Sequence, residues 1–241
     1  MNNAADKIIV ALDVESLEQA RGLVSCLSGT VGAFKIGKQL YTRYGPEAVA
    51  MVHAAGSRVF LDLKYHDIPS TVAKAGCEAV RMGVFMFNVH ALGGSAMIAE
   101  TARAVRDMAH ALGTPAPLIL AVTVLTSMAE ADLAEIGIRE PVEQVVVRLA
   151  RLAQSAGADG VVASPQEIVP IKKTCGPDFV VVTPGIRPAA AAQDDQKRIM
   201  TPAQALASGA DFMVIGRPIT QACEPRESAR AIAADLASGT T

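Results

Sequence analysis

Short runs of β-branched and other apolar residues recur along the chain, and amphipathic stretches rich in alanine separate them. The apolar runs cover residues 8–12, 33–37, 58–64, 86–91, 118–125, 160–163, 179–183 and 211–216. The amphipathic stretches include residues 16–27, 46–55, 71–82, 94–111 and 142–156. Continuous apolar runs that alternate with helical periods predict repeated strand–helix units and a parallel sheet.

Eight such units in 241 residues predict an α/β fold of the (β/α)8 TIM barrel type, as a single domain over residues 1–241. The composition agrees, since 51% hydrophobic and 19% charged residues suit strands that are buried on both faces. A doubly wound open sheet is the alternative, but nothing like G-x-G-x-x-G follows the first strand. No linker or low-complexity tract divides the chain.

Two connections are longer than the others. Residues 126–140 contain a small helical pattern at 128–136, and residues 186–200 have little regular pattern. Long connections after strands are often functional lids, although a tolerated surface insertion remains open for each.

The third apolar run ends in charge, within the stretch FLDLKYHDIPST at 60–71. Because strand side chains alternate, Phe60, Asp62 and Lys64 share one face, and we expect that face to point into the barrel. A buried Asp–Lys pair is weak evidence for mere stability. A catalytic pair and a salt bridge that plugs the barrel both fit the pattern.

Two further charged residues lie in or after buried strands. Asp13 follows the first strand and Lys35 lies within the second. Active sites of barrels collect at the carboxyl ends of the strands. With Asp62 and Lys64, these residues predict an alternating array whose members shift each other's pKa values, which suits proton transfer.

The histidines predict less. His90 ends the fourth strand and is a candidate for the barrel mouth, whereas His66 is either a substrate contact or a surface residue. His53 and His110 lie in helical stretches, where we expect them to be solvated.

The last two strands are followed by glycine and arginine, as Gly185 with Arg187 and Gly216 with Arg217. Loops after strands seven and eight of a barrel frequently bind phosphate. Glycine lets backbone amides approach an anion and arginine holds it with two hydrogen bonds. A simple turn is the alternative for each glycine alone.

Charge and composition exclude several partners. A net charge of −2 without a polybasic run predicts no binding to nucleic acid or anionic membrane, and the apolar run at 116–125 is too short to span a bilayer. The start MNNAADKIIV does not read as a signal peptide. We therefore expect a cytoplasmic protein, with Cys26, Cys77, Cys175 and Cys223 as small buried residues and not a metal or disulfide set.

Taken together, the motifs resemble those of bacterial orotidine 5′-phosphate decarboxylases over essentially the whole chain. The matching segments are D-x-K-x-x-D at 62–67 followed by Ile68-Pro69, ALD at 11–13, FKIG at 34–37, VTVLTS at 122–127, TPGIRP at 183–188 and IGRPI at 215–219. The resemblance implies decarboxylation of orotidine 5′-monophosphate to uridine 5′-monophosphate (UMP) and CO2, the last step of UMP synthesis. It implies no cofactor and no metal.

The resemblance also implies roles for single residues. Lys64 would donate a proton to C6 of the pyrimidine, Asp62 would lie beside the departing carboxylate, Lys35 and Asp67 would complete the charged network, and Asp13 would bind the ribose. The remaining implied contacts are Thr126 with Ser127 on the pyrimidine, and Arg187, Gln196, Gly216 and Arg217 on the phosphate, with residues 186–198 as a lid. Asp67, Ile68 and Thr71 would reach the neighbouring subunit's site, which implies a homodimer.

Three rivals remain open. Magnesium-dependent sugar-phosphate relatives, such as 3-keto-gulonate 6-phosphate decarboxylase or hexulose phosphate synthase, share D-x-K-x-x-D but carry an acidic metal ligand where this chain has Lys35. A barrel aldolase would use Lys64 as a Schiff base, but Asp62 and Asp67 favour its protonated form. A catalytically silent phosphate-binding barrel would not require the Asp–Lys network.

Overall fold

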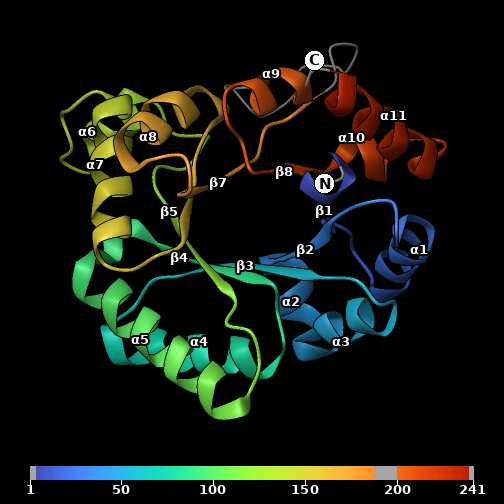
Figure 1. Cartoon of the computed structure of the whole chain (residues 1–241), viewed down its shortest axis with the longest axis horizontal. Coiled ribbons are helices and arrows are strands. Elements are labelled where there is room, and N and C mark those ends of the chain that lie inside the picture. The colour runs from blue at the N-terminus through green and yellow to red at the C-terminus, as the bar shows by residue number, and fades with distance from the viewer. Residues whose placement is uncertain (1–3, 188–199, 239–241) are drawn as a thin grey trace.

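The computed structural model describes residues 4–187 and 200–238, which form a closed barrel of eight parallel strands (Figure 1). Each strand pairs with its neighbours in the chain, and β1 closes the barrel against β8. The fold class predicted from the sequence is therefore confirmed. The strands are β1 (Ile8–Ala11), β2 (Ala33–Gly37), β3 (Val59–Tyr65), β4 (Met86–His90), β5 (Leu118–Val122), β6 (Gly160–Val162), β7 (Val180–Thr183) and β8 (Phe212–Ile215).

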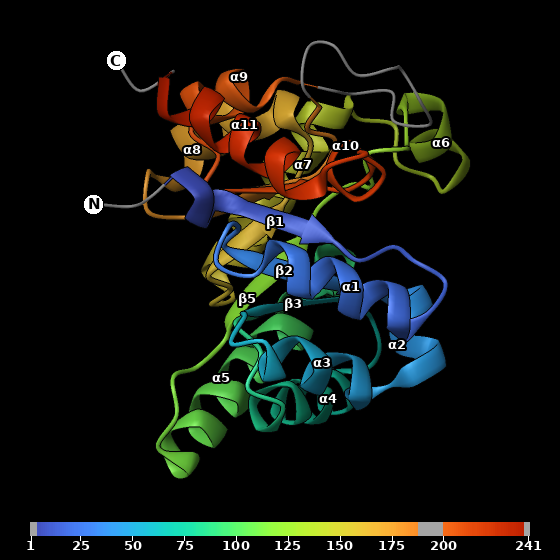
Figure 2. The same ribbon diagram turned by 90° about the vertical axis from the view of Figure 1, so that its right-hand side faces the viewer.

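Helices follow the strands and surround the barrel; Figure 2 shows α9 to α11 on one side of β1 to β3 and α3 to α5 on the other. The α-helices are α1 (Leu17–Leu27), α2 (Lys38–Tyr44), α3 (Pro46–Ala54), α4 (Pro69–Arg81), α5 (Gly94–Leu112), α6 (Glu130–Glu135), α7 (Val142–Ser155), α8 (Ile168–Cys175), α9 (Pro202–Ala207), α10 (Arg217–Thr220) and α11 (Pro225–Ser238). Three 3-10 helices are η1 (Ala4–Lys7), η2 (Ala91–Gly93) and η3 (Pro165–Glu167).

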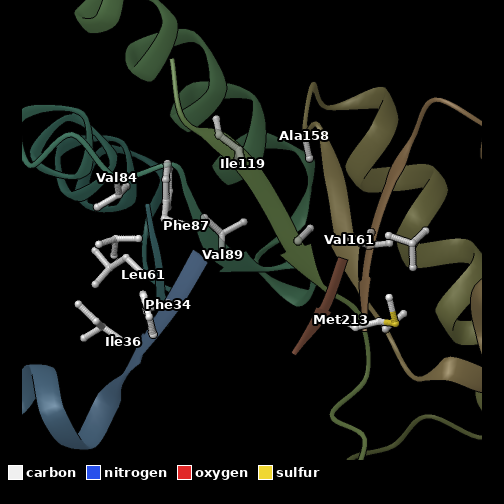
Figure 3. Packing of buried hydrophobic residues seen from close by; sticks show 14 of the residues in the cluster. Phe34, Ile36, Leu61, Val84, Phe87, Val89, Ile119, Ala158, Val161 and Met213 are labelled. Carbon is white, nitrogen blue, oxygen red and sulfur yellow. The ribbon is translucent and has the colours of Figure 1, made fainter. Parts of the chain in front are cut away.

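Alternate side chains of each strand belong to two separate parts of the core. Phe34, Leu61 and Phe87 face outward and pack in the layer between strands and helices (Figure 3). Phe60 and Met86 point inward, to a smaller cluster inside the barrel. Because both faces are apolar, a charged residue on the inner face stands out, and the inner face of β3 changes from Phe60 to Asp62 at its carboxyl end.

Five strands (β1, β4, β5, β6 and β8) end earlier than the apolar runs predict, and β5 differs by the most. β5 ends at Val122 instead of residue 125, although the Thr123 amide still donates to the Val162 carbonyl at 3.2 Å. Val124 and Leu125 then leave the ladder and line a cavity. β4 ends at His90, because Ala91 begins the 3-10 helix η2.

The two long connections differ. The helical pattern at 128–136 forms α6, Glu130–Glu135. The ends of the second connection are held together, since the Arg187 amide donates to the Met200 carbonyl at 3.1 Å and Ile186 bridges Met200. The predicted lid over 186–198 lies mostly outside the described residues.

Some expectations for single residues were wrong. His53 is half-buried and not fully solvated, because its Nδ1 and Nε2 lie 3.3 Å from the Ser57 carbonyl oxygen and 3.1 Å from that of Met82. The cysteines are free but not buried: Cys26, Cys77 and Cys175 are half-buried and Cys223 is exposed.

Among the described helices, none is long and apolar enough to cross a bilayer.

Candidate active site

A cavity of about 500 Å³ opens at the carboxyl ends of the strands. Apolar side chains of the barrel interior, Phe60, Val162 and Val214 among them, form part of its wall. The sequence-predicted site residues that line it are Asp13, Lys35, Asp62, Lys64, Thr126, Arg187, Gly216 and Arg217. These residues come from both ends of the chain, and only closure of the barrel brings them together.

Charges of opposite sign alternate along one wall of this cavity. Lys35 Nζ lies 3.1 Å from Asp13 Oδ1 and 3.4 Å from Asp62 Oδ2. Lys64 Nζ lies 2.5 Å from the other oxygen of the Asp62 carboxylate, Oδ1. Asp62 therefore bridges two ammonium groups, and Lys35 in turn bridges two carboxylates.

The surroundings keep Asp62 ionised. Burial raises the pKa of Asp62. The charges of Lys35 and Lys64 and the hydrogen bonds from Lys64 and Asn88 lower it by more, so the pKa of Asp62 lies below its ordinary value. The side chains of Lys35 and Asp62 are only 10% and 12% exposed, so their charges are weakly screened. A fixed carboxylate next to a fixed ammonium is able to repel one ligand charge and stabilise another.

Lys64 reaches this position through an unusual backbone. Its φ angle of 54° makes it the one non-glycine residue with positive φ among residues 4–187 and 200–238. The register of β3 against β4 also shifts between Leu61 and Tyr65. Non-glycine residues in this conformation cost of order 1–3 kcal/mol and cluster at functional sites. Regular alternation predicted the correct face for Lys64, but a local distortion of the strand places it there.

Asn88 is a member of this site that our reading of the sequence missed. It is fully buried on β4, its Oδ1 accepts from the Lys64 backbone amide at 2.7 Å, and its Nδ2 donates to Asp62 Oδ1 at 2.7 Å. The signal was present in MFNVH, where a polar residue interrupts a buried strand on the same face as His90.

The end of the D-x-K-x-x-D motif and the residues that follow it lie outside the cavity. Asp67, Ile68 and Thr71 do not line the cavity of their own chain, and all three are exposed. Ile68 is 65% exposed, the highest fraction among the large exposed hydrophobic side chains of the described residues. Asp67 Oδ1 accepts a hydrogen bond from the Ile68 amide at 2.6 Å, which fixes the turn before α4.

The described residues expected to bind phosphate line the same cavity, after β7 and β8. Gly185 has a φ of 80°, so the turn after β7 requires a glycine there. Arg187 follows it, and Gly216 and Arg217 lie where β8 passes into α10. Gln196 lies outside the described residues. Thr126 lines the cavity, whereas the adjacent Ser127 is exposed outside it.

The two histidines near the mouth stack on each other, with ring centroids 5.5 Å apart. Burial, followed by the charges of His66, Lys64 and Lys38, lowers the pKa of His90 to about 4. His90 is therefore neutral at physiological pH. Neither ring lines the cavity.

The donor set does not suit a metal ion. Among the described residues, no three His, Cys, Asp or Glu side chains form a group that could hold one. Lys35 occupies the space between the carboxylates of Asp13 and Asp62, so an ammonium group takes the position where a cation would have to bind.

The fold and this array define a (β/α)8 barrel with a charged acid–base site at the carboxyl ends of its strands. A family model described as orotidine 5′-phosphate decarboxylase / HUMPS family matches residues 6–232, and the chain belongs to that family. A relative from Moorella thermoacetica, named orotidine 5′-phosphate decarboxylase, is 57% identical over 97% of this chain and 93% of its own. A relative of the same name from Syntrophotalea carbinolica is 55% identical over 97% and 96%.

Solved structures agree with these sequence relatives. The crystal structure of orotidine 5′-phosphate decarboxylase from Lactobacillus acidophilus superposes with a TM-score of 0.83 at 37% identity, covering 95% of this chain and 98% of that one. An uncharacterized conserved protein from Geobacillus kaustophilus gives a TM-score of 0.84 at 36% identity, with 95% and 99% covered.

Proposed function

We propose that this chain decarboxylates orotidine 5′-monophosphate to UMP and CO2, the last step of UMP synthesis. The observation that carries the proposal is the position of Lys64, whose ammonium group is held 2.5 Å from the ionised Asp62 at the wall of the cavity. Curated relatives more than half identical to the chain carry the name of this enzyme.

The reaction breaks the bond between C6 of the pyrimidine and its carboxylate carbon, and the electron pair of that bond stays on C6. A fixed ammonium group stabilises this developing charge better than water does, because it needs no reorganisation. Lys64 then transfers a proton from Nζ to C6 and regains one from solvent after UMP leaves. The chain's own side chains thus supply both the charge and the proton.

Asp62 and Lys35 prepare this step. Asp62 lies beside Lys64, so a substrate carboxylate bound there meets a negative charge that is relieved when neutral CO2 forms. Lys35 holds the second oxygen of Asp62 and also contacts Asp13, which we assign to the ribose hydroxyls. Thr126, on the cavity wall, is assigned to the pyrimidine.

The exposed residues at the end of the motif and just after it support a homodimer, which is part of this proposal. Asp67, Ile68 and Thr71 do not line their own cavity, and they expose a carboxylate, a large apolar side chain and a hydroxyl at the surface. In a two-fold dimer the same residues of each chain would complete the other's site. The cytoplasmic location expected from the sequence belongs to the same proposal.

Ultraviolet absorbance tests the function directly. Purified protein should convert orotidine 5′-monophosphate to UMP, seen as loss of the orotate chromophore. Saturating chelator should leave the rate unchanged, since the Lys35 ammonium group already lies between the carboxylates of Asp13 and Asp62 and would repel a divalent cation. No turnover would refute the proposal, and a loss that magnesium restores would favour the sugar-phosphate relatives.

The phosphate assignment predicts a selective loss of affinity. Arg217→Ala should weaken UMP binding by about 10- to 100-fold, because hydrogen bonds to a charged group contribute ~1.5–3 kcal/mol. Binding of uridine should barely change, since uridine has no phosphate to hold. Calorimetry or a fluorescence titration with both ligands measures the difference.

Arg230→Ala is the matched control, because Arg230 is an exposed arginine of α11 paired with Glu227. It should leave both ligands unaffected. Equal losses for UMP and uridine in Arg217→Ala would rule out Arg217 as the phosphate contact.

A further inference from the structure

Asn88 makes two hydrogen bonds that meet at the centre of the charged array. Its Oδ1 accepts from the backbone amide of Lys64 and its Nδ2 donates to Asp62 Oδ1, each at 2.7 Å. Asp62 Oδ1 is also the oxygen that Lys64 Nζ contacts. One carboxamide thus holds the backbone of the lysine and the carboxylate that orients its ammonium group.

The first bond compensates for a break in the β3–β4 ladder. Leu61 pairs with Phe87 and Tyr65 pairs with Val89, so β3 uses four residues where β4 uses two. Lys64 lies inside this bulge with its φ of 54°, and its amide takes a side-chain acceptor. A buried amide without a partner is strongly disfavoured, so the Asn88 oxygen favours the conformation that turns Lys64 toward the cavity.

The second bond fixes the orientation of Asp62. Since the Lys64 amide can only donate, Oδ1 of Asn88 must face it, and Nδ2 must then face the carboxylate. A neutral donor holds Asp62 without neutralising it. Asn88 is fully buried, so no water competes for either bond.

We propose that Asn88 is a positioning residue for the reaction, which holds Lys64 and Asp62 in register through its two hydrogen bonds. This inference rests on the proposed decarboxylase activity. Asn88 does not line the cavity, so it acts through Lys64 and Asp62 without touching the substrate. An amide is required because the site needs an acceptor on one side and an uncharged donor on the other.

Asn88→Leu removes both bonds with little change of size. We expect kcat to fall by about 100-fold or more, because misplacing a catalytic group by an ångström has effects of this order. KM should change less than about fivefold, since the residues assigned to ribose and phosphate are untouched. Thr123→Val is the matched control: Thr123 is equally buried, and its Oγ1 donates only to the Val162 carbonyl, outside the array. It should keep kcat within about threefold.

Asn88→Asp gives a readout that a merely structural role would not move. An ionised aspartate still accepts from the Lys64 amide but repels Asp62, whereas a protonated one donates to Asp62 as asparagine does. The ratio of its kcat to wild type should therefore rise at least tenfold as pH falls from about 8.5 to about 5.5. The other charged or titratable groups near this pair are Lys35, Lys64 and His90, which wild type shares, so the ratio cancels them.

The outcomes separate cleanly. A folded Asn88→Leu that keeps kcat within tenfold of wild type would overturn the inference, and so would an Asn88→Asp ratio that does not change with pH. If Asn88→Asp does not fold, Asn88→Leu against Thr123→Val decides alone. Wild-type protein that does not turn over orotidine 5′-monophosphate would instead refute the proposed function, so the two failures are distinguishable.

Discussion

Lys64→Ala should lose turnover of orotidine 5′-monophosphate by about 10⁴-fold or more, which corresponds to ~5.5 kcal/mol of transition-state stabilisation. The size follows from two roles on one atom. Loss of a preorganised charge at a developing anion removes about 10²–10³ in rate, and loss of a positioned general acid removes about 10²–10⁴. Single-turnover measurements of UMP formation give the rate directly.

UMP binding and the fold should largely survive this change, because the residues assigned to the phosphate and the ribose follow other strands. Lys173→Ala is the matched control, since Lys173 is an exposed lysine of α8 that does not line the cavity. A Lys64→Ala protein that keeps its rate within about tenfold, a difference of only ~1.4 kcal/mol, would show that Lys64 is not the proton donor.

The sequence was sufficient to predict the architecture because local patterns of apolar and polar residues indicate each strand and helix of the barrel. Each buried strand appears as a continuous apolar run and each outer helix as an amphipathic period. The errors lie at strand ends, as in β5, where Val124 and Leu125 are apolar because they line the cavity and not because they belong to the strand.

The site was predictable to the extent that charge is unusual in a buried strand. Asp62 and Lys64 interrupt an apolar run, so their charge alone makes them candidates for a functional site. The positive φ of Lys64 and the register shift beside it leave no such mark, because they depend on the pairing of β3 with β4. Asn88 was missed for a related reason. It is an uncharged polar residue of β4, and its role depends on its hydrogen bonds to Lys64 and Asp62 of the neighbouring strand, which the sequence does not show.

His53 shows the same limit in a helix. Its place in a helical stretch suggested solvation, but its two ring nitrogens contact carbonyls of Ser57 and Met82, the latter contributed by the turn after α4. Contacts between distant segments decide burial, and periodicity within one helix does not report them.

Two inactive variants should restore each other's activity if the site is shared between subunits. Lys64 lines the cavity of its own chain, whereas Asp67 lies in the exposed turn before α4 and does not. In a dimer of one Lys64→Ala chain and one Asp67→Asn chain, one site combines both defects. The other site takes an intact Lys64 from one chain and an intact Asp67 from its partner.

Random mixing of equal amounts makes about half of the dimers mixed, so roughly a quarter of all sites should be wild type by two-fold symmetry. The two proteins are mixed, unfolded in denaturant and refolded together, and turnover per subunit is compared with each variant refolded alone. Lys64→Ala mixed with Asp62→Asn is the control: these side chains contact each other at 2.5 Å within one chain, so no mixed dimer contains an intact pair. Activity should therefore return to about a quarter of wild type in the first mixture and stay absent in the second. Verified mixed dimers of Lys64→Ala and Asp67→Asn that remain inactive would place Asp67 in the site of its own chain.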